Sequence, residues 1–206
     1  MPSNPRSLRS KISATNHRLL LERRLKKHLE TYKGTVLVVG AGHDPYRSYL
    51  KKASKIITND IDPKLPNIDI VSNADQIPMA DNSVDVILSI EVFEHVEDLT
   101  ACISECHRLL KPGGILYVTM PFLFHIHGDP HDYRRLTVQG ISQELKPNFN
   151  IIYNEYFGNL ANVFFDSISS VTQILSILRP FFRLGTMIDL TSKRFPSGLI
   201  VIAQKK

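Results

Sequence analysis

One short segment, HIHGDPHDYRRLT at residues 125–137, concentrates side chains that serve in acid–base chemistry and metal binding. Its histidines His127 and His131 carry imidazoles, which titrate near neutral pH and therefore suit removal of a proton from a hydroxyl group. Asp132 could orient one of these histidines through a hydrogen bond. We therefore take His127, His131 and Asp132 as candidate catalytic residues.

The same segment offers side chains that could bind a substrate. Tyr133 could shape a pocket, and the guanidinium of Arg134 or Arg135 could hold an anionic group through two parallel hydrogen bonds. In the structural alternative, Asp132 and Arg134 form an ion pair that braces the segment. The sequence leaves both interpretations open.

A metal site is a further interpretation of the histidines. His125, His127 and His131, with Asp129 or Asp132, offer imidazole and carboxylate ligands that suit zinc or iron. Against this, the cysteines of the chain lie elsewhere, and the histidine spacing differs from the helical HExxH pattern. We therefore predict no metal cofactor.

Hydrophobic periodicity and turn residues predict the elements that position this segment. Strands are expected at residues 35–39, 55–58, 69–72, 84–89, 115–120, 151–156 and 199–203. Helices are expected at residues 17–32, 45–53, 98–110, 137–145 and 159–183, the second with Asp44 as its N-cap. This alternation indicates an α/β fold with a mostly parallel sheet and helices on both faces. Ligands in such sheets bind at the carboxyl ends of the strands.

Glycines and acidic residues follow the predicted strands. Gly-Ala-Gly at residues 40–42 follows the first strand, where glycines let the backbone approach a ligand closely. Asp60 follows the second strand at a spacing typical of a carboxylate that binds ribose hydroxyls, with Asp62 as a nearby alternative. Asp75 and Glu91 follow the third and fourth strands. A nucleoside ligand is therefore expected at this edge.

With these residues in view, the sequence resembles a known family. The segments VLVVGAGHDPY, TNDID, NADQIPMADNSVDVILSIEVFEHV and HRLLKPGGILYVTMPF look like the successive motifs of class I S-adenosylmethionine-dependent methyltransferases, in a type 11-like subgroup. The resemblance covers residues 35–145, and residues 199–203 match the final strand of the family. It implies a Rossmann-like sheet of seven strands whose last strand is antiparallel, and S-adenosyl-L-methionine as the cofactor.

The resemblance also implies roles for individual positions. The cofactor-binding residues it implies are Val39, Gly40, Ala41, Gly42, Asp60, Ile61, Ala74, Asp75, Gln76, Ile90 and Glu91. His95 joins Tyr133 and Arg134 as a candidate substrate-binding residue, although this position in the family often packs locally. Two positions depart from the family pattern, because Val38 stands where an acid is usual and Asp44 where a third glycine is usual. A carboxylate at position 44 could repel the carboxylate of the cofactor.

Charge and composition divide the chain. Residues 1–33 hold nine Lys and Arg against two Glu, whereas the whole chain carries only +5, so the remainder is slightly acidic. We predict a basic N-terminal arm and helix at residues 1–33 and a methyltransferase domain at residues 34–206. A helical insertion is expected at about residues 157–193. It carries one apolar face, which most simply packs on its own domain.

The cellular location of the protein is predicted from the absence of recognisable targeting signals and from the basic N-terminal segment. Neither a leader sequence nor a long apolar run is recognisable, so we expect a cytoplasmic protein. Residues 1–33 and 159–183 could make peripheral contact with the inner face of a membrane.

The predicted function is methyl transfer to a small-molecule, sugar or lipid-like acceptor, at oxygen or nitrogen. One alternative is a catalytically silent module that kept the fold for binding or regulation, favoured by Val38 and Asp44. A nucleic-acid methyltransferase is less well supported, because basic and aromatic residues do not interleave. A nicotinamide-dependent dehydrogenase is disfavoured by Pro45, which stands where a dinucleotide-binding turn needs glycine.

Overall fold

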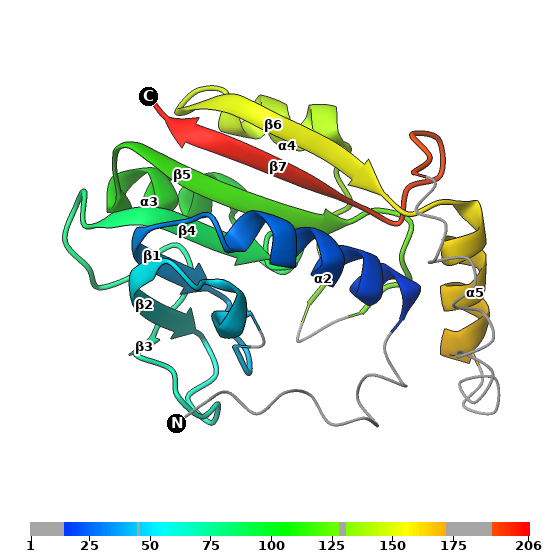
Figure 1. The fold of residues 1–206 in the computed structure, drawn as a ribbon, viewed down its shortest axis with the longest axis horizontal. Helices are drawn as coiled ribbons and strands as arrows, with labels where there is room; N and C mark the ends of the chain where they lie inside the picture. Colours follow the sequence, from blue (N-terminus) through cyan, green and yellow to red (C-terminus); the bar gives the residue numbers. More distant parts are fainter. Residues whose placement is uncertain (1–14, 45, 128–130, 172–190) are drawn as a thin grey trace.

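A seven-stranded sheet forms the centre of the computed structural model, which describes residues 15–44, 46–127, 131–171 and 191–206 (Figure 1). The strands are β1 (Gly34–Val39), β2 (Ala53–Asp60), β3 (Ile70–Val71), β4 (Val84–Ile90), β5 (Leu110–Pro121), β6 (Phe149–Phe157) and β7 (Gly198–Lys205). The helices are α2 (Asn16–Leu29), α3 (Leu99–Leu109), α4 (Val138–Leu145) and α5 (Leu160–Val171). Each expected strand is present, with ends that differ by a few residues.

The sheet has the order β3-β2-β1-β4-β5-β7-β6. Strands β1 to β5 pair in parallel, whereas β7 pairs antiparallel with both β5 and β6. In Figure 1 the last strand lies between β5 and β6. The predicted fold class, with its antiparallel last strand, is therefore confirmed. The strand order reverses between β1 and β4, which is where ligands bind in open α/β sheets.

Apolar residues of the strands alternate between two cores, one on each face of the sheet. In β1, Leu37 and Val39 join the core beneath α3 and α4, while Val36 and Val38 join the core beneath α2. Period-two alternation produces this division, since successive side chains of a strand point to opposite faces. Helices thus cover both faces, as expected.

Helix α2 packs onto the sheet as part of this second core. Thr15 caps it, because the Thr15 side chain accepts a hydrogen bond from the backbone N–H of Arg18. Its leucines Leu20, Leu21, Leu25 and Leu29 are buried. The sheet therefore depends on this helix for one of its two cores, although the helix belongs to the predicted basic segment.

The helix expected at residues 45–53 is absent, and that prediction was wrong. The described part of this segment contains only a single 3₁₀ turn, η1 (Arg47–Tyr49). Asp44 has φ of +46°, which is incompatible with the extended backbone of an N-cap. Its carboxylate instead pairs with the guanidinium of Arg47. Since β2 already begins at Ala53, only one short turn fits between them.

Helix α5 places its polar face inward, contrary to the expected packing of its apolar face. Asn162 and Asp166 are buried, whereas Leu160 and Phe164 are 55% and 57% exposed. The reason is that the carboxylate of Asp166 accepts hydrogen bonds from the first backbone N–H groups of α2. The remainder of the predicted helix lies outside the described residues. Within the described part of the chain, no helix is long and apolar enough to cross a membrane.

Candidate active site at the carboxyl edge of the sheet

A glycine turn follows β1, next to the point where the strand order reverses. Gly40 and Gly42 have φ of +61° and +54°, a conformation that glycine adopts without strain. A Cβ atom on Gly40 would lie 2.5 Å from Cγ2 of Val92, so the absence of a side chain lets the loop after β4 approach. A Cβ atom on Gly42 would meet nothing within 4 Å. Space is therefore open on the side of the turn where Gly42 lies.

Asp60 ends β2 and faces this turn. Its Oδ2 accepts a hydrogen bond of 2.8 Å from the backbone N–H of Gly42, and its Oδ1 accepts one of 3.0 Å from the N–H of Asp62. Each carboxylate oxygen has a second lone pair, so Asp60 can still accept hydrogen bonds from a ligand. The carboxylate of Asp62 accepts from the N–H of Lys64 within its own turn.

A buried acceptor lies on the loop after β3. Oδ1 of Asp75 is shielded from solvent and has no hydrogen-bond partner. Its neighbour Ala74 packs against the core, and Gln76 is exposed. Ile61, which follows Asp60, is 62% exposed and stays outside the core. Each strand end from β1 to β3 thus presents a group that suits a nucleoside.

Three other residues predicted to bind the cofactor instead pack in the core and support the glycine turn. Val39, Ala41 and Ile90 are buried, and the N–H of Ala41 donates to the carbonyl of Asn59. These contacts link the glycine turn to β2. Their side chains therefore belong to the core, which leaves mainly backbone atoms to face a ligand.

Glu91 follows β4 with φ of +56°, and both its carboxylate oxygens have partners. Oε2 lies 2.9 Å from Nε2 of His17, and Oε1 accepts a hydrogen bond of 2.8 Å from the hydroxyl of Thr119. Burial alone would raise the pKa of Glu91, but the His17 imidazole and the Thr119 hydroxyl outweigh it and hold the pKa below its usual value. Glu91 therefore acts as an ionised link between elements.

His17 was missed by the reasoning from sequence. Besides Glu91, its imidazole contacts the hydroxyl of Ser197 at 2.6 Å, and its backbone N–H donates to Asp166 at 2.8 Å. It thus joins α2 to the loop after β4, to the residue before β7 and to α5. Only its position at the start of an amphipathic helix was visible in the sequence, and that position gives no sign of these partners.

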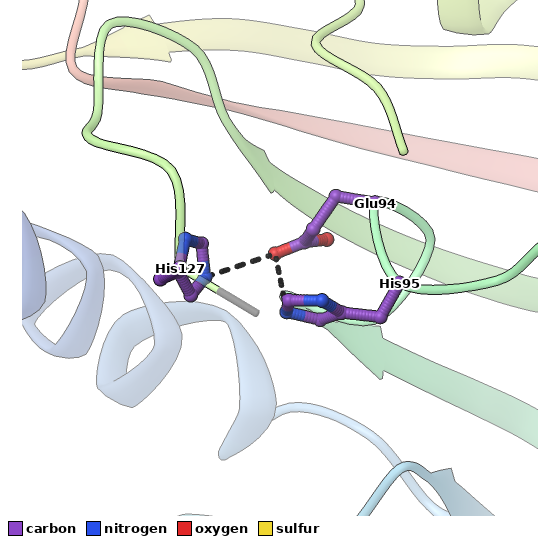
Figure 2. A group of neighbouring side chains, drawn as sticks. All are labelled: Glu94, His95 and His127. Atoms are coloured by element: carbon purple, nitrogen blue, oxygen red, sulfur yellow. Dashed lines mark ion pairs between the residues drawn. The ribbon is translucent and has the colours of Figure 1, made fainter. Parts of the chain in front are cut away.

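Glu94 was also missed, and it is the most unusual group at this edge. Its side chain is fully buried, and neither carboxylate oxygen has a hydrogen-bond partner. Burial, assisted by the negative charge of Glu91, raises the pKa of Glu94 to about 9. Figure 2 shows the carboxylate directed between two imidazoles. Oε1 lies 3.6 Å from Nε2 of His95 and 3.8 Å from Nε2 of His127.

The other nitrogen of each imidazole faces an acceptor. Nδ1 of His95 is hydrogen-bonded to the carbonyl of His131. Nδ1 of His127 lies 3.3 Å from the carbonyl of His125, 3.4 Å from Oδ2 of Asp132 and 3.5 Å from Nη2 of Arg135. Burial lowers the pKa of His127, so its imidazole is neutral at neutral pH.

Asp132 holds the histidine segment in place. Its carboxylate forms a two-point ion pair with Arg135 and accepts a hydrogen bond of 3.0 Å from the backbone N–H of His127. Burial opposes ionisation, but the Arg135 guanidinium prevails and holds the pKa of Asp132 at about 2. The predicted bracing pair therefore exists with Arg135 as the partner of Asp132, rather than Arg134.

The side chains of three other predicted residues lie away from the group formed by Glu94, His95, His127 and Asp132. The guanidinium of Arg134 donates to the carbonyls of Phe93, Val96 and Glu97, so it braces the loop after β4 instead of facing a substrate. The side chain of His131 is exposed, and Tyr133 is 45% exposed beside it. Among the predicted catalytic residues, the structure brings together His127 and Asp132.

The ligand set foreseen for a metal differs from the group that the structure assembles. Among the described residues, the side chains with suitable spacing are those of Glu94, His95 and His127, whose ligand atoms lie within 4.8 Å of one another. The glutamate–histidine pair follows β4, and the third residue follows β5 (Figure 2). The signal available in the sequence was the adjacent Glu-His after a buried strand, within EVFEHV.

Comparisons with known proteins agree with this architecture. Residues 37–118 match a family model described as a methyltransferase domain. A protein of Mycolicibacterium smegmatis named a probable S-adenosylmethionine-dependent methyltransferase is 41% identical over 59 residues, which is 28% of this chain and 23% of that protein. The malonyl-[acyl-carrier protein] O-methyltransferase of Methylococcus capsulatus is 49% identical over 47 residues, 23% of this chain and 17% of that protein.

Similarity of fold extends much further than similarity of sequence. The chain spans about a fifth of the length of these curated relatives. A crystal structure of an S-adenosylmethionine-dependent methyltransferase from Mesorhizobium loti superposes with a TM-score of 0.64 at 16% identity, covering 94% of this chain and all of that one. The sheet order, the glycine turn and the segment matched at residues 37–118 thus agree with the architecture of methyltransferase domains.

Proposed function

We propose that the protein transfers a methyl group from S-adenosylmethionine to a small-molecule, sugar or lipid-like acceptor. The observation that carries the proposal is the contact between Asp60 and Gly42, which sets an ionisable acceptor beside the open side of the glycine turn. Ribose hydroxyls need such acceptors, and a backbone without Cβ atoms permits close approach. The unpartnered Oδ1 of Asp75 supplies a further acceptor, which suits the exocyclic amine of adenine.

Asp44 departs from the family pattern, and a neighbouring arginine offsets the charge of its carboxylate. The Asp44 carboxylate is paired with Arg47, although burial raises its pKa. The guanidinium neutralises the charge that would otherwise face the carboxylate of the cofactor. This supports cofactor binding despite the unusual residue. No comparable compensation is evident for Val38, which is simply part of the core.

When bound, the cofactor supplies a methyl group on a sulfonium, and the sulfur keeps the bonding electron pair as the methyl group leaves. The protein must orient the acceptor and receive the proton that a hydroxyl or amine releases. His127 suits this task better than His131, because its pKa is lowered and Asp132 fixes its position. An oxygen acceptor is further supported by the O-methyltransferase relative.

Calorimetric titration with S-adenosylmethionine and S-adenosylhomocysteine tests the proposal. Replacing Asp60 with Asn should weaken binding by tenfold or more, about 1.4 kcal/mol, because the amide presents only one acceptor oxygen. The matched control is Asp62→Asn, since that side chain serves its own turn, and it should leave the affinity unchanged. Equal weakening by both changes would contradict the assignment of Asp60.

The alternative is a silent binding module, for which Val38 is the supporting observation. A folded wild-type protein that binds neither form of the cofactor would favour that alternative. A nucleic-acid acceptor remains the least supported reading. Peripheral contact with a membrane through residues 1–33 and 159–183 stays a prediction, to which exposed Leu160 and Phe164 add apolar surface.

A further inference from the structure

We propose that Glu94, His95 and His127 bind a divalent transition-metal ion of the zinc class. The three side chains converge from two loops at the carboxyl edge of the sheet, as Figure 2 shows. Two imidazoles and one carboxylate are a donor set that suits Zn²⁺ and Fe²⁺ rather than Mg²⁺ or Ca²⁺, which prefer oxygen ligands. This set differs from the one suggested by the histidine segment alone.

The hydrogen-bond arrangement explains why a cation fits here. Nδ1 of His95 faces the carbonyl of His131, and Nδ1 of His127 lies nearer to a carbonyl and a carboxylate than to Nη2 of Arg135, which is 3.5 Å away. We therefore assign the protons to these two nitrogens. Each Nε2 then offers a lone pair, and both lone pairs face the carboxylate of Glu94. A cation that displaces the proton of the Glu94 carboxyl would therefore meet three acceptors. A fully buried carboxyl group whose two oxygens both lack partners is rare in a folded protein, and a bound cation would give these oxygens a partner.

Outer contacts hold both imidazoles as they do in metalloproteins. Metal-binding histidines usually donate their second N–H to a carbonyl or carboxylate, which fixes ring orientation. His95 is held in this way by the carbonyl of His131, and His127 by Asp132, which is itself fixed by Arg135. The residues around the three ligands therefore already favour metal binding.

Distances and exposure are compatible with entry of an ion. Oε1 of Glu94 lies 3.6 and 3.8 Å from the two imidazole nitrogens. Ligand atoms on a tetrahedral zinc ion lie about 3.3 Å apart, for bonds of about 2.0 Å, so the two glutamate–histidine distances must close by a few tenths of an ångström. All three ligand atoms lie within 4.8 Å of one another, so rotation of the two exposed imidazoles must supply the remaining closure. Glu94 is fully buried, whereas the side chains of His95 and His127 are 19% and 33% exposed, so an ion would enter from the histidine side.

Three protein ligands leave at least one coordination position open, as in catalytic rather than structural zinc sites. The role that we give to this open coordination position depends on the methyl transfer proposed above. An acceptor hydroxyl bound there would become more acidic and lose its proton to solvent, because the metal stabilises the alkoxide. Nε2 of His127 would then serve as a ligand, and the metal would replace it as the means of deprotonation.

Cobalt(II) is the probe of choice, because its visible absorption reports coordination by nitrogen and oxygen. The protein, first treated with a chelator, is titrated with Co²⁺ and then with Zn²⁺ in competition. We expect a single Co²⁺ per chain with a visible band that Zn²⁺ removes. Glu94→Gln and His95→Asn should each weaken binding at least 100-fold, because each removes a ligand and leaves two.

His125→Asn is the matched control, since His125 lies in the same loop and its side chain is exposed. Its ring packs edge-on against that of His127 at 6.2 Å between centroids but lies outside the group of three ligands. This variant should bind Co²⁺ as the wild type does. Absence of stoichiometric binding in the wild type, or equal weakening by His125→Asn, would overturn the proposal. Circular dichroism confirms that each variant is folded, and Glu94→Gln keeps the shape of the side chain.

Failure of this proposal can be separated from failure of the proposed function. Co²⁺ binding is measured without cofactor, whereas the Asp60→Asn experiment is measured in the presence of chelator. If turnover persists in chelator, the proposed methyl transfer stands and the metal is not needed. His127 would then be the group that removes the proton. Turnover that chelator abolishes and Zn²⁺ restores would support the metal site directly.

Discussion

Nε2 of His17, in the first turn of α2, lies 2.9 Å from Oε2 of Glu91, which follows β4, although the two residues are 74 positions apart. The contact joins the helix over one face of the sheet to the loop that approaches the glycine turn. Since both side chains are largely shielded from solvent, the pair should stabilise the fold as well as position the loop.

A double-mutant cycle would measure this contact. His17→Asn and Glu91→Gln each leave a shielded polar group without its partner, so each should lower the free energy of unfolding by about 2–4 kcal/mol. The double variant should lose less than the two single losses combined, by about 1 kcal/mol or more. Urea unfolding at pH 7 gives these values. Simple additivity would show that the two side chains do not interact.

The buried carboxyl of Glu94 should make the stability of the metal-free protein depend on pH. Its pKa is about 9 in the folded state, against a usual value of 4.5. The stabilisation is complete below pH 4.5 and is lost as the pH rises toward 9, at about 1.4 kcal/mol per pH unit.

Glu94→Gln should remove this dependence, because the amide does not titrate. Urea unfolding between pH 6 and 8 would measure the slopes of the two proteins. Glu97→Gln is the control, because that side chain is exposed, and it should keep the slope of the wild type. Identical slopes for the wild type and Glu94→Gln would contradict the assignment.

The two glycines of the turn should respond differently to alanine. Gly40→Ala combines a positive φ with a contact of 2.5 Å to Val92, so we expect it to destabilise the fold by more than about 2 kcal/mol. Gly42→Ala meets open space and should cost only about 1 kcal/mol for its backbone conformation. If the cofactor occupies that space, Gly42→Ala should still weaken binding of S-adenosylhomocysteine in calorimetry. Unchanged affinity would indicate that the cofactor lies elsewhere.

Helix α5 offers a comparison between its buried and exposed faces. Asp166→Asn removes the charged acceptor from the first N–H groups of α2 and should lower the free energy of unfolding by about 1–2 kcal/mol. Phe164→Ser alters an exposed side chain and should change stability by less than about 0.5 kcal/mol. Thermal unfolding of both variants would rank them. A greater loss for Phe164→Ser would show that its apolar side chain is covered in solution.

The sheet was predictable because each strand carries its own signal. Runs such as residues 35–39 and 84–89 are mostly apolar and end at polar residues or glycine, so local pattern and final burial agree. The helix expected after Asp44 failed for the opposite reason. Capping residues alone do not create a helix where the chain must reach the next strand within a few residues.

The site was predictable only in part, because its unusual features arise from contacts between distant segments. Asp60 and Gly42 could be named, since their positions after neighbouring strands bring them together. Glu94 could not be distinguished from an ordinary acidic residue, because its burial depends on the loop after β5 that covers it. For the same reason, choosing Arg135 over Arg134 as the partner of Asp132 required knowledge of the loop's path.

The position of β7 has a consequence for how the protein is made. This strand, the last element of the chain, lies between β5 and β6, and Ser197 just before it contacts His17 near the other end of the sequence. A ribosome must therefore have released β7 before β6 can join the sheet, and Ser197 before His17 gains its full set of partners. Until then the edge of β5 stays unpaired and open to association with other chains. Chaperone binding during synthesis should accordingly persist until β7 emerges from the ribosome.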